Sequence, residues 1–142
     1  MNPEYSVIVP LYNEEEVLPS FMTELSNRMD SLGGEYEVLA IDDGSEDKTG
    51  EILQAMVKTN SRLAYYQLTR NFGHQAAILA GLNLAKGKCV GIIDGDGQDP
   101  PEVLVRMFKS LKEGYDVVYG LRKNRKESLW FRFFCKLFYR IL

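Results

Sequence analysis

The chain has 142 residues, 45% of them hydrophobic and 26% charged, with a formal net charge of -3. That length allows one domain or a part of one, and the composition is that of a globular protein, which excludes a disordered or low-complexity chain. Because the sequence also lacks a signal-peptide pattern and an apolar run of roughly 20 residues, it predicts no membrane span within these residues.

Short apolar runs rich in β-branched residues recur along the chain and alternate with helical patterns. The runs cover residues 5–10, 36–41, 63–68, 88–93 and 116–119, and each is long enough for a buried strand. Between them, apolar residues recur at helical spacing, as in Val17, Leu18, Phe21, Leu25 and Met29. This alternation predicts right-handed βαβ units, which form a mostly parallel α/β sheet with helices on both faces.

Polar clusters directly follow four of the predicted strands. In such sheets ligands bind beyond the carboxyl ends of the strands, so we expect these clusters to converge on one edge and form the site. Their members are Tyr12, Asn13 and Glu14, then Asp42, Asp43, Gly44 and Ser45, then Arg70 and Asn71, and last Asp94, Asp96, Gln98 and Asp99.

The cluster after the second run has two adjacent carboxylates, Asp42 and Asp43. They can accept hydrogen bonds from a nucleobase and from ribose hydroxyls, so we expect the pair to contact a nucleoside. Ser45 or Asp47 is suited to cap the next helix. For Asp47 a purely structural cap is the favoured interpretation.

Arg70 and His74 lie where the third helical pattern begins. Arg70 could reach a diphosphate or tie its loop to the acidic cluster. His74 is the only histidine of the chain. A lone histidine at a helix start more often packs or caps than reacts, so we expect a structural role for it.

The strongest chemical signal is the motif Asp94-Gly-Asp96-Gly-Gln98-Asp99-Pro-Pro after the fourth run. Two carboxylates separated by one small residue can both approach a hard cation such as Mg²⁺ or Mn²⁺, which prefers oxygen ligands and shares its shell with substrate phosphates. Glycines at 95 and 97 permit close approach of the backbone. Asp99 before two prolines also has the pattern of a helix N-terminus, and both interpretations hold if they fall on different residues.

The end of the chain differs in charge from the rest. Residues 1–121 hold 10 Lys and Arg against 19 Asp and Glu, whereas residues 122–142 hold 7 against 1. From Trp130 to Ile141 an aromatic stripe and a basic stripe alternate at helical spacing, which is typical of an interfacial helix drawn to phosphates or anionic lipid. A core helix packed on the sheet is the equal alternative. Cys89 and Cys135 lack metal-ligand spacing and a disulfide framework, so we expect reduced core thiols in a cytoplasmic protein.

Four motifs together resemble family 2 glycosyltransferases of the GT-A fold, in the branch of dolichol-phosphate mannosyltransferases and polyprenyl-phosphate glycosyltransferases. They are Pro10-Leu-Tyr12-Asn-Glu14, Asp42-Asp43-Gly-Ser, Arg70-Asn-Phe-Gly and the acidic motif at residues 94–102. They occur in order, with the expected spacing, over essentially the whole chain. The resemblance implies a donor-binding core at residues 1–121 and the basic, amphipathic start of an acceptor and membrane-interface region at residues 122–142. It also implies that the chain is part of a longer protein.

The resemblance further assigns roles residue by residue. The nucleoside pocket would be lined by Pro10, Tyr12, Glu14, Asp42 and Asp43. Mg²⁺ or Mn²⁺ and the donor diphosphate would be held by Asp94, Asp96 and Gln98. Arg122 would meet the acceptor phosphate, with Arg132 and Lys136 as further candidates, so the expected catalytic residues are Asp94, Asp96 and Arg122.

These observations predict a metal-dependent hexosyltransferase that uses a UDP- or GDP-sugar and, as the resemblance implies, inverts the anomeric carbon by direct displacement. The expected acceptor is a polyprenyl or dolichyl phosphate, which is mostly dianionic at neutral pH and needs no general base. A saccharide hydroxyl, the alternative acceptor, would need a carboxylate to take its proton. We expect a protein that is peripheral at the cytoplasmic membrane face, with a full-length form open to membrane anchoring and to oligomer formation, and that binds no nucleic acid.

Two other classes compete with this interpretation. A nucleotidyltransferase would carry a basic, glycine-rich loop after the first strand, where this chain is acidic. A non-catalytic module that binds nucleotide sugars or membranes would not need the acidic metal pair.

Overall fold

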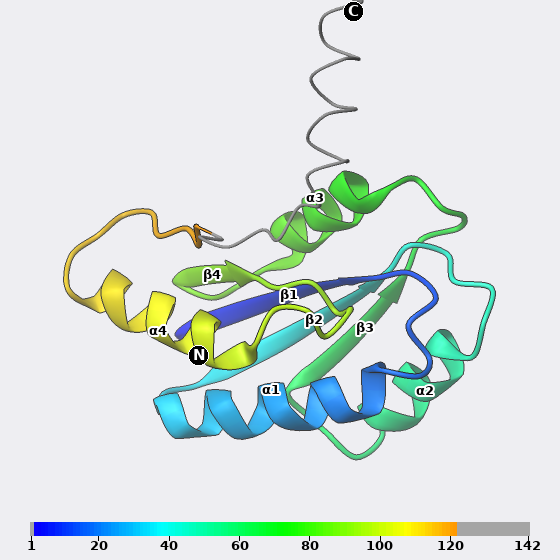
Figure 1. Ribbon diagram of the computed structural model, residues 1–142, viewed down its shortest axis with the longest axis horizontal. Coiled ribbons are helices and arrows are strands. Elements are labelled where there is room, and N and C mark those ends of the chain that lie inside the picture. Colours follow the sequence, from blue (N-terminus) through cyan, green and yellow to red (C-terminus); the bar gives the residue numbers. More distant parts are fainter. Residues whose placement is uncertain (1, 122–142) are drawn as a thin grey trace, which may run out of the picture.

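The structure, a computed structural model, describes residues 2–121 (Figure 1). In that part of the chain four strands alternate with four helices, as the sequence pattern predicts. Their bounds are β1 Tyr5–Leu11, α1 Leu18–Leu32, β2 Tyr36–Asp42, α2 Thr49–Val57, β3 Leu63–Gln67, α3 His74–Leu84, β4 Cys89–Ile92 and α4 Pro101–Lys112.

The four strands form one parallel sheet in the order β3-β2-β1-β4. β1 pairs with β2 from Tyr5 opposite Tyr36 to Leu11 opposite Asp42. Helices α1, α2 and α4 cover one face of the sheet and α3 covers the other (Figure 1). The predicted α/β fold with helices on both faces is confirmed, and the carboxyl ends of the strands meet at one edge.

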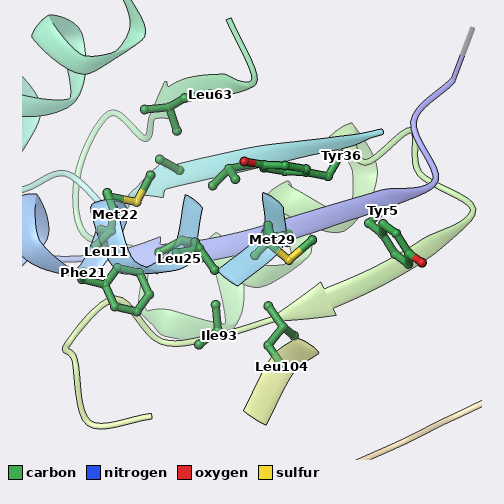
Figure 2. Close-up of a cluster of buried hydrophobic side chains, with 14 of the residues drawn as sticks. Tyr5, Leu11, Phe21, Met22, Leu25, Met29, Tyr36, Leu63, Ile93 and Leu104 are labelled. Atoms are coloured by element: carbon green, nitrogen blue, oxygen red, sulfur yellow. The ribbon is translucent and has the colours of Figure 1, made fainter. Parts of the chain in front are cut away.

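Both faces of β1 are buried because its side chains alternate between the two helical layers. Tyr5 and Val7 face α1 and α4, and the rings of Tyr5 and Phe108 lie 4.7 Å apart between centroids. Figure 2 shows this cluster, which includes Leu25 and Met29 of α1. Ile8 points the other way and packs against Ala77 of α3. Burial of each such aliphatic side chain contributes roughly 1.5–3 kcal/mol, which makes β1 the centre of the core.

α3 lies close to the sheet because it carries Gly81. A Cβ at this position would lie 2.4 Å from Cγ2 of Ile8, so a larger residue would push the helix away from β1. Since α3 runs antiparallel to the strands, its first turn lies beside the carboxyl edge of the sheet. Gly81 therefore helps to place His74 at that edge.

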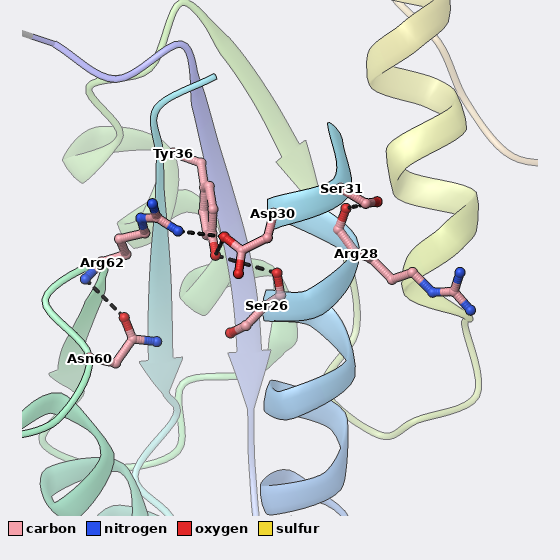
Figure 3. A network of polar contacts seen from close by, with 7 residues as sticks. All are labelled: Ser26, Arg28, Asp30, Ser31, Tyr36, Asn60 and Arg62. Atoms are coloured by element: carbon pink, nitrogen blue, oxygen red, sulfur yellow. Dashed lines mark hydrogen bonds and ion pairs between the residues drawn. The ribbon is translucent and has the colours of Figure 1, made fainter. Parts of the chain in front are cut away.

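A polar network joins α1 to β2 and to the segment before β3 at the opposite edge of the sheet (Figure 3). The Tyr36 hydroxyl donates to Asp30 Oδ1 at 3.1 Å, and Arg62 forms an ion pair with the same carboxylate. The Arg62 guanidinium also lies 4.7 Å from the centre of the Tyr36 ring. These contacts hold α1 against the amino end of β2, which is the end of the sheet that carries none of the predicted site residues.

The predicted strand at residues 116–119 is wrong. Residues 117–121 make no strand pairing, and Val117 and Tyr119 are 78% and 74% exposed. A cleft of about 640 Å³ lies between these residues and the elements β4 and α4. The run does not pair with β4, the edge strand of the sheet, so it stays irregular despite its β-branched residues.

Within residues 2–121 no helix is long and apolar enough to cross a membrane. Cys89 is a free thiol and is half-buried in β4. The predictions for Cys135 and for the aromatic and basic stripes from Trp130 to Ile141 fall outside the described residues.

Candidate functional site

The loops after β1 and β2 are joined by side chains of each loop that bond to the backbone of the other. Asn13 N donates to Ser45 Oγ at 2.9 Å, and Glu46 N donates to Asn13 Oδ1 at 2.9 Å. One residue further on, Glu14 N donates to Thr49 Oγ1 at 2.8 Å. Asn13 has a φ of 56°, a left-handed conformation that asparagine adopts more readily than most residues. This exchange fixes the two loops relative to each other.

Asp47 strengthens the same junction. Its carboxylate accepts hydrogen bonds from Glu15 N at 3.1 Å and from Thr49 N at 2.9 Å, while Lys48 N donates to Glu15 Oε2 at 2.8 Å. Burial opposes the charge of Asp47, but its hydrogen bonds to Thr49 and Glu15 outweigh burial and lower the pKa of this carboxyl. Asp47 therefore has structural contacts, but Lys48 and not Asp47 is the N-cap residue of α2. The Asp47 carboxylate joins the loop after β1 to the first amide of α2.

Asp43 ties the end of β2 to the loop before α3. Its two carboxylate oxygens accept hydrogen bonds from Phe72 N and Gly73 N, each at 2.8 Å. The neighbouring Gly44 has a φ of 71°, and a Cβ there would lie 2.5 Å from the carbonyl carbon of Arg70. The Arg70 guanidinium lies over the Phe72 ring, 4.2 Å from its centre. Charge-assisted hydrogen bonds and close backbone packing thus hold this third loop at the carboxyl edge.

Asp42 is enclosed by protein groups. Its residue is fully buried, its Oδ1 accepts from Ser45 N at 2.8 Å, and its Oδ2 accepts from the Tyr65 hydroxyl at 3.2 Å and from Gln67 Nε2 at 3.1 Å. Burial and the charge of Asp42 raise the pKa of Tyr65 to about 12, so the phenol remains a donor at neutral pH. The structure therefore separates the predicted nucleoside pair: Asp43 reaches the cavity described below, and Asp42 does not.

Asp94 and Asp96 lie in the loop after β4, which stays beside β1 because Gly95 N donates to Pro10 O at 3.4 Å. Asp96 Oδ1 accepts a hydrogen bond from Gln98 N at 2.9 Å, so part of this carboxylate orders its own loop. The Gln98 residue itself is exposed. Its main chain supports Asp96 through this hydrogen bond.

The loops surround a cavity of about 250 Å³ at the carboxyl edge. The predicted site residues that line it are Pro10, Tyr12, Glu14, Asp43, Asp94 and Asp96. Asp42 and Gln98 do not line it, and Arg122, Arg132 and Lys136 lie outside the described residues. The other lining residues are Leu11, Asn71, Gly73, His74, Ala77 and Gly95.

Sequence reasoning assigned no functional role to His74, whose Nε2 lies 3.3 Å from Asp94 Oδ1. Asn71, in contrast, belongs to one of the clusters expected to converge. A signal for His74 was present in the sequence, since it starts a helix directly after one of these clusters. Nothing in the chain order, however, indicated which other cluster it would meet.

Negative charge is concentrated in the cavity. Burial raises the pKa of Glu14 above its ordinary value, and the charges of Asp96 and Asp47 raise it further. Asp43 and Asp94 line the same space. Such a group of carboxylates favours either proton uptake or a bound cation.

The carboxylate oxygens of the cavity suit a hard divalent cation. Asp94 and Asp96 line one cavity. Among residues 2–121 no group of three or more His, Cys, Asp and Glu side chains is placed so that it could hold a metal ion by itself. Mg²⁺ and Mn²⁺ do not need such a group, because in nucleotide sites one or two carboxylates hold the ion and phosphate oxygens and water complete its shell. The residues present fit an ion of this kind.

Comparison with known proteins identifies similar chains. The uncharacterized glycosyltransferase YkcC of Bacillus subtilis is 42% identical over 140 residues, which cover 98% of this chain and 43% of that protein. The undecaprenyl-phosphate 4-deoxy-4-formamido-L-arabinose transferase of Aeromonas hydrophila is 44% identical over 128 residues, 89% of this chain and 39% of that protein. Among solved structures, the mannosyltransferase PcManGT of Pyrobaculum calidifontis in complex with GDP-Man and Mn²⁺ has a TM-score of 0.64 and 26% identity, over 78% of this chain and 33% of that one.

The parallel sheet and its structural neighbours define a GT-A fold. The family described as Glycosyl transferase family 2 matches residues 6–141. The chain belongs to glycosyl transferase family 2, which confirms the resemblance seen in its motifs. It spans less than half the length of the two curated relatives.

Replacing Asp43 with alanine leaves the amides of Phe72 and Gly73 without their acceptors. Each hydrogen bond to a charged group contributes roughly 1.5–3 kcal/mol, but these two amides are only partly buried, so water replaces part of what is lost. We therefore expect the free energy of unfolding to fall by about 2–3 kcal/mol. We also expect faster hydrogen exchange at these two amides. Urea denaturation and amide exchange measure the two effects. Ser45→Ala, which removes an acceptor from the neighbouring loop, should leave both amides protected, and equal protection in Asp43→Ala would contradict this role.

Glu14→Gln should stabilise the fold at neutral pH. The pKa of Glu14 is raised in the folded state above its ordinary value of 4.5, so its ionised form destabilises the folded protein above that raised pKa. The stability difference between this variant and the wild type should therefore be largest at neutral pH and disappear by about pH 4.

Urea denaturation across this pH range measures the effect of Glu14→Gln. Glu16→Gln makes the same charge change at an exposed position two residues away and should give a smaller difference. If Glu14→Gln is no more stable than the wild type at pH 7, burial and the neighbouring carboxylates do not destabilise the ionised form of Glu14.

Proposed function

We propose that this chain carries the donor-binding part of a metal-dependent glycosyltransferase that transfers a hexose from a UDP- or GDP-sugar to a polyprenyl phosphate. The observation that carries the proposal is the cavity shared by Asp94 and Asp96 at the carboxyl edge of the sheet. Parallel α/β sheets bind their ligands at this edge. The division into a donor-binding core at residues 1–121 and an acceptor region beginning at residues 122–142 is part of the same proposal.

The nucleoside of the donor contacts Pro10, Tyr12, Glu14 and Asp43 in this proposal. Tyr12 is 40% exposed and lines the cavity. Each carboxylate oxygen has two lone pairs, so Asp43 can accept from a base or ribose while it still holds the third loop. Asp42 acts indirectly, because it holds Ser45, which in turn holds Asn13.

Asp94 and Asp96 bind Mg²⁺ or Mn²⁺ in this proposal, and Gln98 supports Asp96 through its main chain. A bound cation would supply positive charge for the departing diphosphate. Without a cation, Glu14, Asp43, Asp94 and Asp96 would repel the donor, so the chain's own residues make donor binding depend on metal. The PcManGT structure, which was solved with GDP-Man and Mn²⁺, supports a donor and an ion of these classes.

The proposed reaction forms one bond and breaks one. An oxygen of the acceptor phosphate attacks the anomeric carbon of the sugar, and the bond from that carbon to the β-phosphate oxygen breaks. The nucleoside diphosphate leaves with the electron pair, and attack from the opposite side inverts the anomeric centre. Since a phosphate monoester is mostly dianionic at neutral pH, no carboxylate of the chain has to remove a proton.

Two observations support a lipid phosphate as the acceptor. The Aeromonas hydrophila relative is named for transfer to undecaprenyl phosphate. The sequence of residues 122–142 also holds 7 Lys and Arg against 1 Glu, which would attract an acceptor phosphate and an anionic membrane surface. In this proposal Arg122 meets the acceptor phosphate, Arg132 and Lys136 assist it, and the protein works at the cytoplasmic face of a membrane.

Asp96→Ala should remove the metal-dependent part of donor binding and leave the fold intact. We expect Mn²⁺ to strengthen binding of a UDP- or GDP-sugar to the wild type by about tenfold or more, equal to about 1.4 kcal/mol, and to have no such effect on the variant. Calorimetric titration with and without Mn²⁺ measures this difference, and circular dichroism checks the fold.

Glu113→Ala is the matched control for Asp96→Ala, because it removes an exposed carboxylate beyond the far end of α4. It should bind the donor as the wild type does. Donor binding that is equally strong in Asp96→Ala, or the same with and without Mn²⁺, would contradict the proposal. A transfer assay with undecaprenyl phosphate and with a saccharide then tests the acceptor class, and transfer to the saccharide alone would overturn that part.

A further inference from the structure

His74 lies in the cavity without a role in the proposed reaction. It is the first residue of α3, and its side chain is 50% exposed. Its Nε2 lies 3.3 Å from Asp94 Oδ1, and the Asp94 side chain is 41% exposed. This contact joins the third loop to the acidic loop after β4, which are separated by about 20 residues of chain.

The backbone of His74 is held on both sides. Immediately before it, Gly73 has a φ of 98°, which favours glycine, and donates its amide to Asp43. Immediately after it, the first turn of α3 closes with Ala76 N donating to Gly73 O at 2.8 Å. One turn along, Ala77 is fully buried against Ile8. The imidazole is therefore carried by a fixed helix start.

Asp94 benefits from such a neighbour because of the surface it lies on. A half-exposed carboxylate can adopt several rotamers, and most of these would not present an oxygen to the ion proposed between Asp94 and Asp96. A hydrogen bond to one carboxylate oxygen restricts those rotamers and leaves the other oxygen for a cation. Partners of this kind commonly orient the ligands of metal ions.

We propose that His74 is a positioning residue for the metal site: its Nε2, which lies beside Asp94 Oδ1, donates a hydrogen bond to that oxygen when the cation binds and holds the carboxylate in the rotamer that binds the cation. The inference rests on the proposed function, since it assumes an ion at Asp94 and Asp96. A neutral imidazole with its proton on Nε2 is a sufficient donor. His74 takes no part in the bonds that form or break.

Titration of the full-length protein with Mn²⁺ alone, followed by the electron paramagnetic resonance signal of free Mn²⁺, tests the proposal without turnover. His74→Leu keeps the bulk but removes the donor, and we expect it to weaken Mn²⁺ binding about tenfold. His74→Gln places an amide donor near the position of Nε2 and should restore the affinity to within about threefold of the wild type. Gln75→Ala, at the next and exposed position of α3, should bind Mn²⁺ as the wild type does.

The outcomes separate this inference from the function on which it rests. If the wild type has no Mn²⁺ site, or has one that Asp96→Ala does not remove, both the proposed function and this inference are overturned. A wild-type site that depends on Asp96 but is unchanged in His74→Leu would overturn the inference alone. The inference also fails if His74→Gln binds Mn²⁺ as weakly as His74→Leu, because a restored donor must restore the site. The inference fails as well if His74→Leu weakens the binding of a nucleoside diphosphate but not that of Mn²⁺, because His74 would then contact the phosphates directly.

Discussion

The shape of the candidate site depends on the hydrogen bonds that the carboxylate of Asp43 accepts. This carboxylate lies at the end of β2 and accepts two backbone hydrogen bonds from Phe72 and Gly73, which precede α3. β3, the strand before this loop, is at the far edge of the sheet, whereas β4 is at the other. The loop must therefore cross the sheet, and Asp43 fixes its path. His74 reaches Asp94 as a result.

The loops after β1 and β2 are also held together by hydrogen bonds from side chains to backbone. The side chains of Asn13, Ser45, Asp47 and Thr49 each bond to the backbone of the facing loop. Such bonds fix the main chain and leave neighbouring side chains to face the cavity. A site whose loops are ordered before a ligand arrives loses less conformational entropy when it binds. The cost of this arrangement is electrostatic, because the carboxylates that order the loops and those proposed to bind metal crowd one another.

The sequence predicted the four strands and four helices of the described chain because β-branched runs buried on both faces are characteristic of parallel sheets. It also predicted the edge at which the polar clusters meet. The sequence treated Asp42 and Asp43 as a pair, whereas in the structure only Asp43 lines the cavity. Strand alternation contained this distinction, since Ala40 and Asp42 share one face and Ile41 and Asp43 share the other. The expected strand at residues 116–119 failed because its formation depends on a partner, which local propensity does not supply.

Other features could not have been predicted from the sequence pattern. The approach of His74 to Asp94 depends on the strand order, on the Asp43 contact and on the close packing of Gly81 against Ile8. Gly95 was expected to permit close approach of the backbone, and in the structure it packs against β1, since a Cβ there would lie 2.2 Å from Cδ2 of Leu11. Packing against β1 is thus reason enough for this glycine. Both features arise from three-dimensional neighbours that are distant in the chain.

The proposed chemistry requires one ion to bind to both Asp94 and Asp96 in the loop after β4. A crystal structure of the full-length protein with Mn²⁺ and a nucleoside diphosphate, with anomalous data collected at the manganese edge, tests this most directly. We expect one anomalous peak within about 2.2 Å of an oxygen of Asp94 and an oxygen of Asp96, with phosphate oxygens completing the shell. A nucleotide bound at this edge with no such peak, or manganese bound away from both residues, would contradict the account.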